Sequence, residues 1–587
     1  MTSPFFGLDI ATRSLRAQQM LVDVANQNIA NANTPGYSRQ EAVVKETLPY
    51  PIPVFRQSGE AGQLGTGVEV KEINRSRDLF ADYQYRNQVA AQGNWDAQSS
   101  GLKQIEAVVN EPSTSGLSTL MTRYWQAWQE VGNSPSDVSV RANLLEQGKA
   151  LAESFQSTVH QFQQQQRDVD NQVSLTVDDV NNYAKQIANL NTQISQVETG
   201  GMKANDLRDQ RDLLLDKLSS LVNITSVESS EGSVNVYVAG HQLVDRSVAH
   251  TVGLDRSGVF AQVVWADGTN TPLVPADGRL AGLMHSRDVD IQGRIDSINV
   301  LASRIIQSVN AVHSAGVGID GTAGRNFFSG TNAVDMSIDP TLTTSGIAAA
   351  RPTGTTPAYA AGDSSNAVAL AQVQNAVTQH VPVPPTPSEM VNGKALASTT
   401  ILGVDVGGAA VNKTFTFTYN GATVTVSDGT NTRTAQLTTF ADPTTGRTVY
   451  TLDTGTAGVQ DATLGPGLGV RLTFSAASSV PTATALNDLN SQGGQRVTTQ
   501  GPSTVNDQYA QEIAAIGVKS STAQGQAANQ KVMVTQLQRQ RQDIGGVSLD
   551  EEATHLIQYQ HAYQAAARVI SVMDSMLDTL INHTGVA

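Results

Sequence analysis

Residues 149–199 read KALAESFQSTVHQFQQQQRDVDNQVSLTVDDVNNYAKQIANLNTQISQVET and contain neither glycine nor proline. Two registers of mostly apolar side chains repeat every seven residues along this stretch. The first register is Ala152, Val159, Gln166, Val173, Val180, Ile187 and Ile194, and the second is Phe155, Phe162, Val169, Thr176, Tyr183, Leu190 and Val197. The spacing predicts one long helix, roughly 75 Å at 1.5 Å per residue, with coiled-coil packing. The fold is therefore expected to be built around this helix.

The same spacing marks both ends of the chain. Near the N-terminus the stripe is Leu8, Leu15, Val22 and Ile29; near the C-terminus it is Leu549, Leu556, Tyr563, Ile570 and Leu577. Each stripe could pack on a globular core. Alternatively, the two stripes pack on each other and on neighbouring subunits, and these nine residues are then assembly contacts. Narrow stripes without a partner bury too little to offset chain entropy, so the second interpretation predicts poorly ordered ends in a single chain.

Further helices are predicted at 206–222, from Ile291 to Val312, and at about 504–542, and DVDIQG (288–293) is placed at a helix start. Two hairpins are predicted. One is GSVNVYVAGHQLV (232–244). The other is TFTFTYNGATVTVSDG (414–429), where a two-residue Asn420-Gly421 turn would pair Phe417 with Val424. The proline cluster VPVPPTPSEM (381–390) is interpreted as a linker into a separate β domain.

The expected fold class is mainly α with inserted β domains, arranged as a rod whose base is a coiled coil of both termini. Four domains are expected: a terminal assembly domain (1–50 with 546–587), a long-helix core (51–222 with 286–314 and 499–545), a β-rich domain (223–285 with 315–380) and a variable β insert (381–498). The β modules are expected to project outward from the helices.

Composition excludes several classes of function. The net charge is −15 and no basic run occurs, which argues against binding to nucleic acid. The chain contains no cysteine, which excludes disulfides and thiolate chemistry. No basic head followed by an apolar run marks a cleaved signal, and no stretch suits membrane insertion. The chain is expected to remain in the cytoplasm or to leave the cell without a cleaved signal.

No stretch of the sequence indicates catalysis, a metal or a cofactor. None of the nine histidines belongs to an HExxH pair, and DVDIQG lacks the glutamate that a calcium loop needs at its twelfth position, where Asn299 stands. GQLGTG (62–67) lacks the order of a dinucleotide loop. We therefore predict no enzyme activity, no catalytic residue, no metal site and no cofactor.

The stretch NIANANTPGYSRQ (28–40) is locally a helix stop, because Pro35 disfavours helical geometry at Thr34 and Gly36 accepts a positive φ. It also resembles the motif near the start of bacterial flagellar rod, hook and hook-associated proteins. Three further stretches resemble the hook-associated members: 62–86, 205–244 and 546–580. By this resemblance Asn33, Thr34, Pro35, Gly36 and Tyr37 form a turn that leads the chain from the inner helical layer to the next domain.

The resemblance implies a structural protein of the extracellular flagellum at the hook–filament junction. It implies type III export, assembly with itself in a helical layer, and contact with hook protein and a second junction protein. It also implies an export chaperone at the C-terminal region. Two alternatives stay open: a hook or distal rod subunit, and a surface-binding, adhesin-like module in the 381–498 insert.

Overall fold

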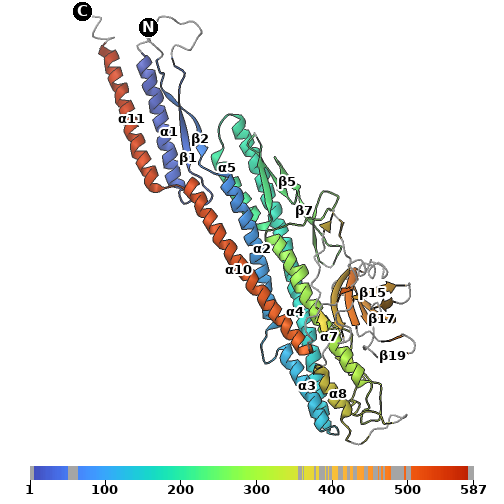
Figure 1. Cartoon of the computed structure of the whole chain (residues 1–587). Coiled ribbons are helices and arrows are strands. Elements are labelled where there is room, and N and C mark those ends of the chain that lie inside the picture. Colours follow the sequence, from blue (N-terminus) through green and yellow to red (C-terminus); the bar gives the residue numbers. More distant parts are fainter. Residues whose placement is uncertain are drawn as a thin grey trace, which may run out of the picture.

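The computed structural model describes residues 5–49, 64–229, 231–258, 260–353, 360, 362–375 and 504–579, together with the backbone strands between 379 and 496. Long helices run side by side through most of the molecule, and the N- and C-terminal helices lie together at one end (Figure 1). The predicted proline-rich linker lies largely outside the described residues.

Helices build the body of the molecule. Their bounds are α2 Leu79–Val109, α3 Leu117–Asn133, α4 Val138–Thr199, α5 Asn205–Leu221, α6 Arg279–His285, η1 Ser286–Ile291, α7 Gln292–His313, α8 Ser365–Gln372, η2 Val373–Asn375 and α10 Val505–Gly545. Along the body α10 packs on α2, while α3, α5 and α7 pack on α4. The mainly helical part of the fold-class prediction is confirmed.

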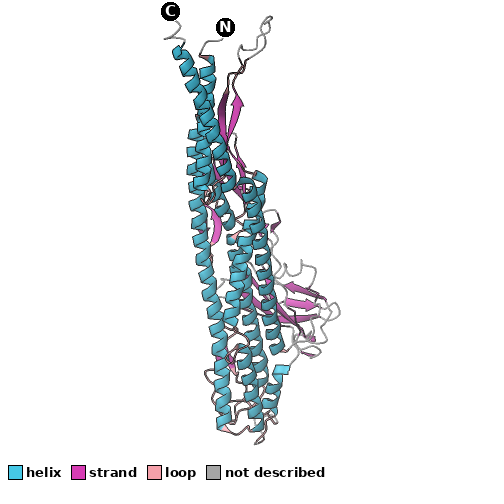
Figure 2. Ribbon diagram, turned by 90° about the vertical axis from the view of Figure 1, so that its left-hand side faces the viewer, coloured by secondary structure: helices cyan, strands magenta, loops and turns pink. Residues whose placement is uncertain are grey.

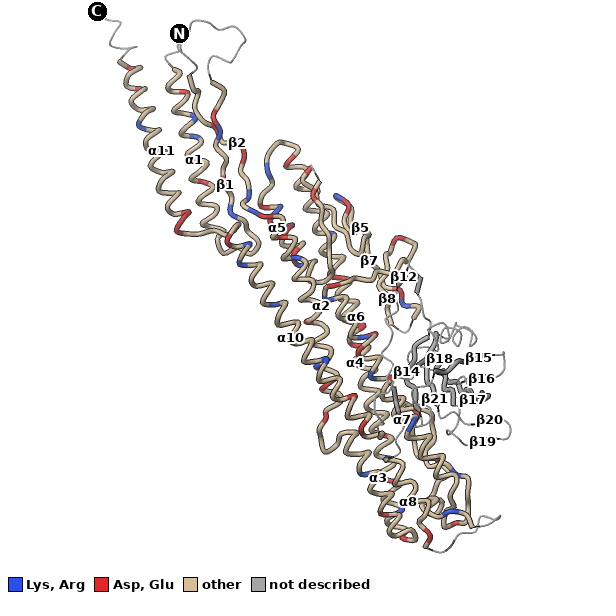
Figure 3. The backbone as a smooth tube through the Cα atoms, in the orientation of Figure 1, with Lys and Arg blue, Asp and Glu red and all other residues tan. Residues whose placement is uncertain are grey.

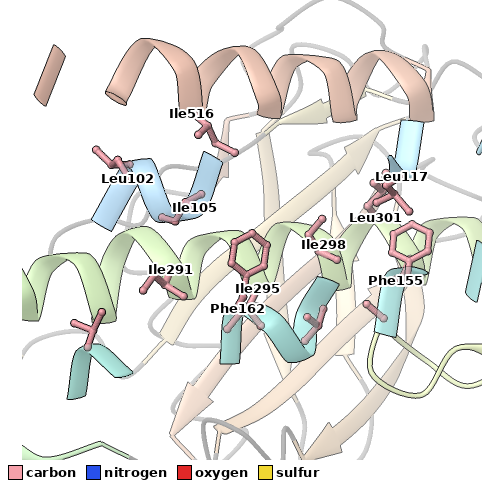
Figure 4. Packing of buried hydrophobic residues seen from close by; sticks show 14 of the residues in the cluster. Leu102, Ile105, Leu117, Phe155, Phe162, Ile291, Ile295, Ile298, Leu301 and Ile516 are labelled. Carbon is pink, nitrogen blue, oxygen red and sulfur yellow. The ribbon is translucent and has the colours of Figure 1, made fainter. Parts of the chain in front are cut away.

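The long helix is the centre of the core. All seven residues of its first heptad register are buried, as are the first four of the second register. Figure 4 shows Phe155 and Phe162 of α4 among side chains of α2, α7 and α10, including Ile105, Ile298 and Ile516. The predicted helix is thus confirmed, and its stripe is buried within a single chain.

The helix begins earlier than predicted. It starts at Val138, where the Asp137 side chain accepts a hydrogen bond from the backbone N–H of Ser139. The prediction stopped at Lys149 because Gly148 disfavours a helix interior. In the structure an added Cβ at Gly148 would lie 2.8 Å from Phe327 Cε1. Gly148 therefore makes room for an aromatic ring and does not end the helix.

The start of the third predicted helix was also wrong. Helical geometry is continuous from Arg279 to His313, with a π-helical segment at 286–291 inside it. This segment lies close to α2, because an added Cβ at Gly101 would lie 2.0 Å from Ser286 Oγ. DVDIQG thus lies inside a helix and not at a helix start, and Asp290 is buried there.

Short strands flank the helical body. They are β3 Ile224–Glu228, β4 Val234–Val238, β5 His241–Asp245, β6 Val248–Ala249, β7 Val252–Asp255, β8 Gln262–Trp265, β9 Phe328–Ser329 and β10 Ser337–Ile338. The predicted hairpin at 232–244 is confirmed as β4 and β5, joined by Ala239 and Gly240, which have φ of 49° and 81°. Both central residues have positive φ, as a type I′ turn requires.

A separate antiparallel sheet follows α8. Its strand order is β11-β14-β21-β18-β17-β16-β15-β22. The strands are β11 Gln379–Val381, β14 Thr399–Val406, β15 Thr414–Tyr419, β16 Val424–Ser427, β17 Thr432–Ala441, β18 Arg447–Asp453, β21 Val470–Ala477 and β22 Gln495–Arg496. Short pairs β12 Met390–Val391 with β13 Lys394–Ala395, and β19 Gln460–Asp461 with β20 Gly465–Pro466, lie outside this order. The expected hairpin register was wrong by two residues. Phe417 pairs with Val426, and pairing ends at Tyr419 and Val424, so four residues join the strands.

The last residue of α7, His313, is a buried histidine. His313 Nδ1 lies 2.8 Å from the carbonyl of Arg325, while Nε2 accepts a hydrogen bond from the Ala348 N–H at 3.0 Å. This pairing fixes the neutral ring with the proton on Nδ1, since a proton on Nε2 would face an N–H donor. Burial lowers the pKa of His313 to about 4, with opposing contributions from Asp339 and from Arg141 and Arg325.

We expect acid to weaken the fold at His313. Between pH 6.5 and about 4 the unfolded histidine binds a proton and the folded one does not, so stability present above pH 6.5 is lost as pH falls through this window. The loss at His313 amounts to about 3 kcal/mol. Urea denaturation at pH 7.5 and pH 4.5 measures it. The variant H313Q should lose this part of the pH dependence; an unchanged slope in H313Q would contradict the assignment.

Candidate assembly surface

The terminal layer consists of α1 Phe6–Asn31, β1 Gln40–Glu46, β2 Val68–Arg75 and α11 Leu549–Asp578. α1 and α11 pack antiparallel, and an added Cβ at Gly7 would lie 2.1 Å from Met573 Cε. β1 and β2 form an antiparallel hairpin that packs on α1, where Gly67 lies against Ile10. Figure 2 shows this hairpin beside the paired helices at the end that carries both termini. The two terminal stripes therefore lie next to each other within one chain.

The predicted assembly residues are only partly covered. On α1, Leu8, Leu15, Val22 and Ile29 are half-buried; on α11, Leu556, Ile570 and Leu577 are half-buried, while Leu549 and Tyr563 are exposed by 52% and 37%. The buried residues of the two helices are mostly small: Ala11, Ala17, Ala25, Asn28, Glu552 and Ala566. A contact built on alanines leaves the flanking large side chains accessible. Their role in assembly stays a prediction.

A second apolar line on α11 was missed by the sequence analysis. Val569, Val572 and Met576 are exposed by 50%, 52% and 62%. Their spacing of three and four residues places them on one face of the helix, about a quarter turn from the line through buried Ala566 and half-buried Met573. These three residues lie outside the seven-residue stripe from Leu549 to Leu577, so the spacing of that stripe does not indicate them. The C-terminal part of α11 thus offers apolar surface beyond the contact with α1.

The motif turn has a defined hydrogen-bond pattern. α1 ends at Asn31 and Gly36 has φ of 83°. The buried Asn28 side chain accepts hydrogen bonds from the Tyr37 hydroxyl at 2.8 Å and the Gln40 N–H at 2.9 Å, and its amide donates to the Gln40 carbonyl. Burial, with the nearby carboxylates of Asp206, Asp209 and Glu552, raises the pKa of Tyr37. Asn33, Thr34, Pro35 and Gly36 remain exposed.

Charged residues gather where this turn meets the body. We call them the Arg–Asp cluster: Arg75, Arg77, Arg86, Arg541, Asp82, Asp209, Asp212 and Asp216. Figure 3 shows acidic and basic positions along α5 beside the end of β2. The four arginines and four aspartates balance in charge and come from β2, α2, α5, α10 and the β2–α2 connection. Buried ion pairs require such mutual compensation.

Asp209 joins the terminal layer to α5. Its carboxylate accepts hydrogen bonds from the Ser38 N–H at 2.9 Å, the Ser38 hydroxyl at 2.8 Å and Arg75 at 2.8 Å. Arg75 also donates to Asp212 at 2.9 Å. Burial raises the pKa of Asp209, although Arg75 and Ser38 oppose the shift. For Asp212 burial also acts to raise the pKa, but Arg77, Arg86 and Arg75 outweigh it and hold the pKa well below its usual range.

Body elements complete the cluster. Arg541 of α10 lies 2.7 Å from Asp82 and 2.9 Å from Asp216, and its guanidinium lies 4.3 Å from the centre of the Tyr85 ring. Arg86 binds Asp216 at 2.8 Å. Within the described residues, no group of three or more histidine, aspartate or glutamate side chains is arranged to hold a metal ion. The cluster is built from ion pairs.

A sequence signal for this cluster existed. Asp206, Asp209, Asp212 and Asp216 recur at three- and four-residue spacing in the predicted helix 206–222. That spacing places four acids on one face of a helix, at positions where a core-facing helix would carry apolar residues. The arginines that pair with these aspartates lie more than a hundred residues away in the sequence, so the sequence pattern does not identify the pairs.

Comparison with known proteins finds similarity to flagellar axial proteins. Residues 102–328 match the model of the flagellar hook-associated protein FlgK helical domain, and residues 544–583 match the flagellar basal body rod FlgEFG protein C-terminal model. The chain is 29% identical to flagellar hook-associated protein 1 of Bacillus subtilis, covering 100% of this chain and 99% of that protein. The chain is thus similar to flagellar hook-associated protein 1 along essentially its whole length.

A second relative is similar over almost the full length of the chain. Flagellar hook-associated protein 1 of Escherichia coli is 29% identical, over 97% of this chain and 98% of that protein. The flagellar hook junction protein FlgK from Burkholderia pseudomallei, a solved structure, aligns with a TM-score of 0.45 and 20% identity, covering 79% of this chain and 100% of that one. The first family match spans most of the helical body, and the second spans α11. Among the described residues, no helix is both long and apolar enough to cross a membrane.

Proposed function

We propose that this hook-associated protein is a structural subunit of the extracellular bacterial flagellum, forming the layer that joins hook to filament. The observation that carries the proposal is the match to hook-associated protein 1 along essentially the whole length of both chains. The terminal layer supplies an assembly surface, because its nine stripe residues are half-buried or exposed in the single chain. No catalytic role belongs to this proposal.

The proposed partners follow from the family. The chain packs with further copies of itself through the terminal layer, and it contacts hook protein on one side and a second junction protein on the other. It leaves the cell through the type III route without a cleaved signal, with an export chaperone at its C-terminal region. The exposed line Val569, Val572 and Met576 supports a role for α11 in such contacts.

Deletion of the gene tests this function. Electron microscopy of the mutant cells should show hooks without filaments, and flagellin should appear in the medium. Absence of hooks would instead indicate that the protein is a subunit of the rod or the hook. Normal filaments would refute the junction role. Restoration of filaments by the intact chain is the control.

A second candidate function concerns the insert. The sheet of β11 to β22 stands to one side of the helical bundle in Figure 1, away from the terminal layer. A module in that place could bind a surface without taking part in assembly.

Deleting residues 381–498 should separate these roles. We expect filaments to form at the normal number, because the insert's sheet lies beside the helical body, away from the terminal layer. Filament counts by electron microscopy measure this, and a surface-adhesion assay on the same cells measures any loss of binding. Loss of filaments would show that the insert takes part in the junction.

A further inference from the structure

The second half of α10 is held to the body by little apolar packing. In residues 517–545, all of which the structure describes, only Ser520 and Ala523 are buried. Val518 and Val532 are each exposed by 67%, so the larger apolar side chains of this segment bury little surface. We call residues 517–545 the strap, because this segment runs beside α2 towards the end that carries both termini (Figure 1).

The strap also has a weak intrinsic preference for helical structure. Gly517 and Gly525 lie in the interior of α10, where glycine is unfavourable. An added Cβ at either position would meet no atom of a neighbouring segment within 4 Å, so close packing does not require these glycines. The first half of α10 is better anchored, because Thr504 caps the helix and Gln508 accepts a hydrogen bond from Arg304 at 2.7 Å. A contact at the far end of the strap therefore decides whether the strap stays on α2.

Arg541 supplies a contact at this end. Its Nε lies 2.7 Å from Asp82 of α2, and its Nη2 lies 2.9 Å from Asp216 of α5. The same guanidinium lies 4.3 Å from the centre of the Tyr85 ring. A planar guanidinium that binds two carboxylates and stacks on a ring holds more firmly than a single exposed ion pair. The Arg541 side chain is 18% exposed, so salt and water screen these contacts only in part.

We propose that Arg541 is a clamp that keeps the strap on α2 in the free chain. The clamp lies within the body, between α10, α2 and α5, and it requires no order in α1 or α11. It fixes the place at which the chain leaves the body towards α11. Segments that follow can then become ordered on assembly from one fixed origin, which lowers the entropy cost of adding a subunit. Only this use in assembly rests on the proposed function.

The two carboxylates stay paired when Arg541 is removed. Asp82 keeps Arg77, whose Nε lies at 2.6 Å, and Asp216 keeps Arg86 at 2.8 Å. Breaking a buried ion pair is strongly destabilising when it leaves a charge buried without a partner. Because neither carboxylate is left in that state, loss of Arg541 should release the strap and leave the rest of the body folded.

Hydrogen–deuterium exchange of the free full-length chain, measured by mass spectrometry, tests the clamp. In the unsubstituted chain the backbone amides of residues 525–541 should exchange slowly. In R541Q their exchange should become about tenfold faster or more, because the charge-assisted contacts that oppose local opening are lost. Exchange in α4 should not change. R539Q is the matched control, since Arg539 is exposed on the same strap, and it should leave exchange of the strap unchanged.

A conservative variant tests the guanidinium fork itself. R541K keeps the positive charge but cannot bind both carboxylates in one plane, so exchange of its strap should lie between the rates of R541Q and the unsubstituted chain. Fast exchange of the strap in the unsubstituted chain, or equal exchange in R541Q, would overturn the proposal. A rise in α4 as large as that in the strap would also overturn it, because it would indicate a general loss of stability. Filament assembly is not measured here, so the clamp can fail while the proposed function stands.

Discussion

Replacing Ile570 with aspartate should abolish filament growth while the body stays folded. Ile570 lies half-buried on α11, at a predicted assembly position beside the contact with α1. Burying an isoleucine contributes about 1.5–3 kcal/mol at each contact. A buried carboxylate without a partner adds several kcal/mol of cost. The same contact recurs in every copy of a layer, so the free-energy cost of the substitution is added once for each subunit.

Val22→Asp on α1 should have the same effect, since Val22 is also half-buried in the terminal layer. Filament counts by electron microscopy and circular dichroism of the purified chains measure the two outcomes. Val518→Asp is the matched control, because Val518 is 67% exposed on α10 in the body. Normal filaments with Ile570→Asp and Val22→Asp would show that these positions do not carry assembly.

Replacing Trp128 with alanine should cause the largest loss of stability in the body. Trp128 is fully buried and lies 5.3 Å from Phe327, 6.1 Å from His313 and 6.5 Å from Tyr124, measured between ring centres. These rings join α3 to the end of α7 and to the loop before β9. Truncation of a buried tryptophan costs about 3–5 kcal/mol, because the cavity collapses only in part.

Urea denaturation of the full chain at pH 7.5 measures this loss. Leu175→Ala on α4 is the control: Leu175 is 65% exposed, so its truncation should change the free energy of unfolding by less than about 0.5 kcal/mol. Trp128→Phe should lose less than Trp128→Ala because it fills part of the cavity. Equal stability of Trp128→Ala and the unsubstituted chain would contradict this account of the core.

The elements that sequence predicted well are those specified by local pattern. The heptads of 149–199 predict α4 because their spacing alone places one face inward, and Gly240 predicts a turn because glycine tolerates the positive φ found there. Errors arose where a distant residue overrides local preference. Gly148 continues a helix because Phe327 occupies the space beside it, and Asp288–Gly293 lies within a helix that packs on Gly101.

The junction between layer and body could not be predicted for a related reason. Ser38, Arg75 and Asp209 belong to three segments that are far apart in sequence. Ser38 and Arg75 resemble ordinary surface residues in their own contexts, and the acidic face of α5 does not indicate which residues pair with it. Only the tertiary fold makes Asp209 a shared acceptor. Family resemblance did single out three of the segments that meet here, but as motifs and without the contacts.

Because α1 packs on α11, the terminal layer forms only when the chain extends through α11. α1 cannot bury its alanines against α11 until the remainder of the polypeptide has been delivered, since α11 is the last described helix. Contacts between residues so distant in sequence form late, after the entropy of closing the intervening loop has been overcome. A chain cut short anywhere could fold much of its body and would still lack half of the layer. Truncated copies would thus fail to assemble at the growing end, because they lack the α11 half of the assembly surface.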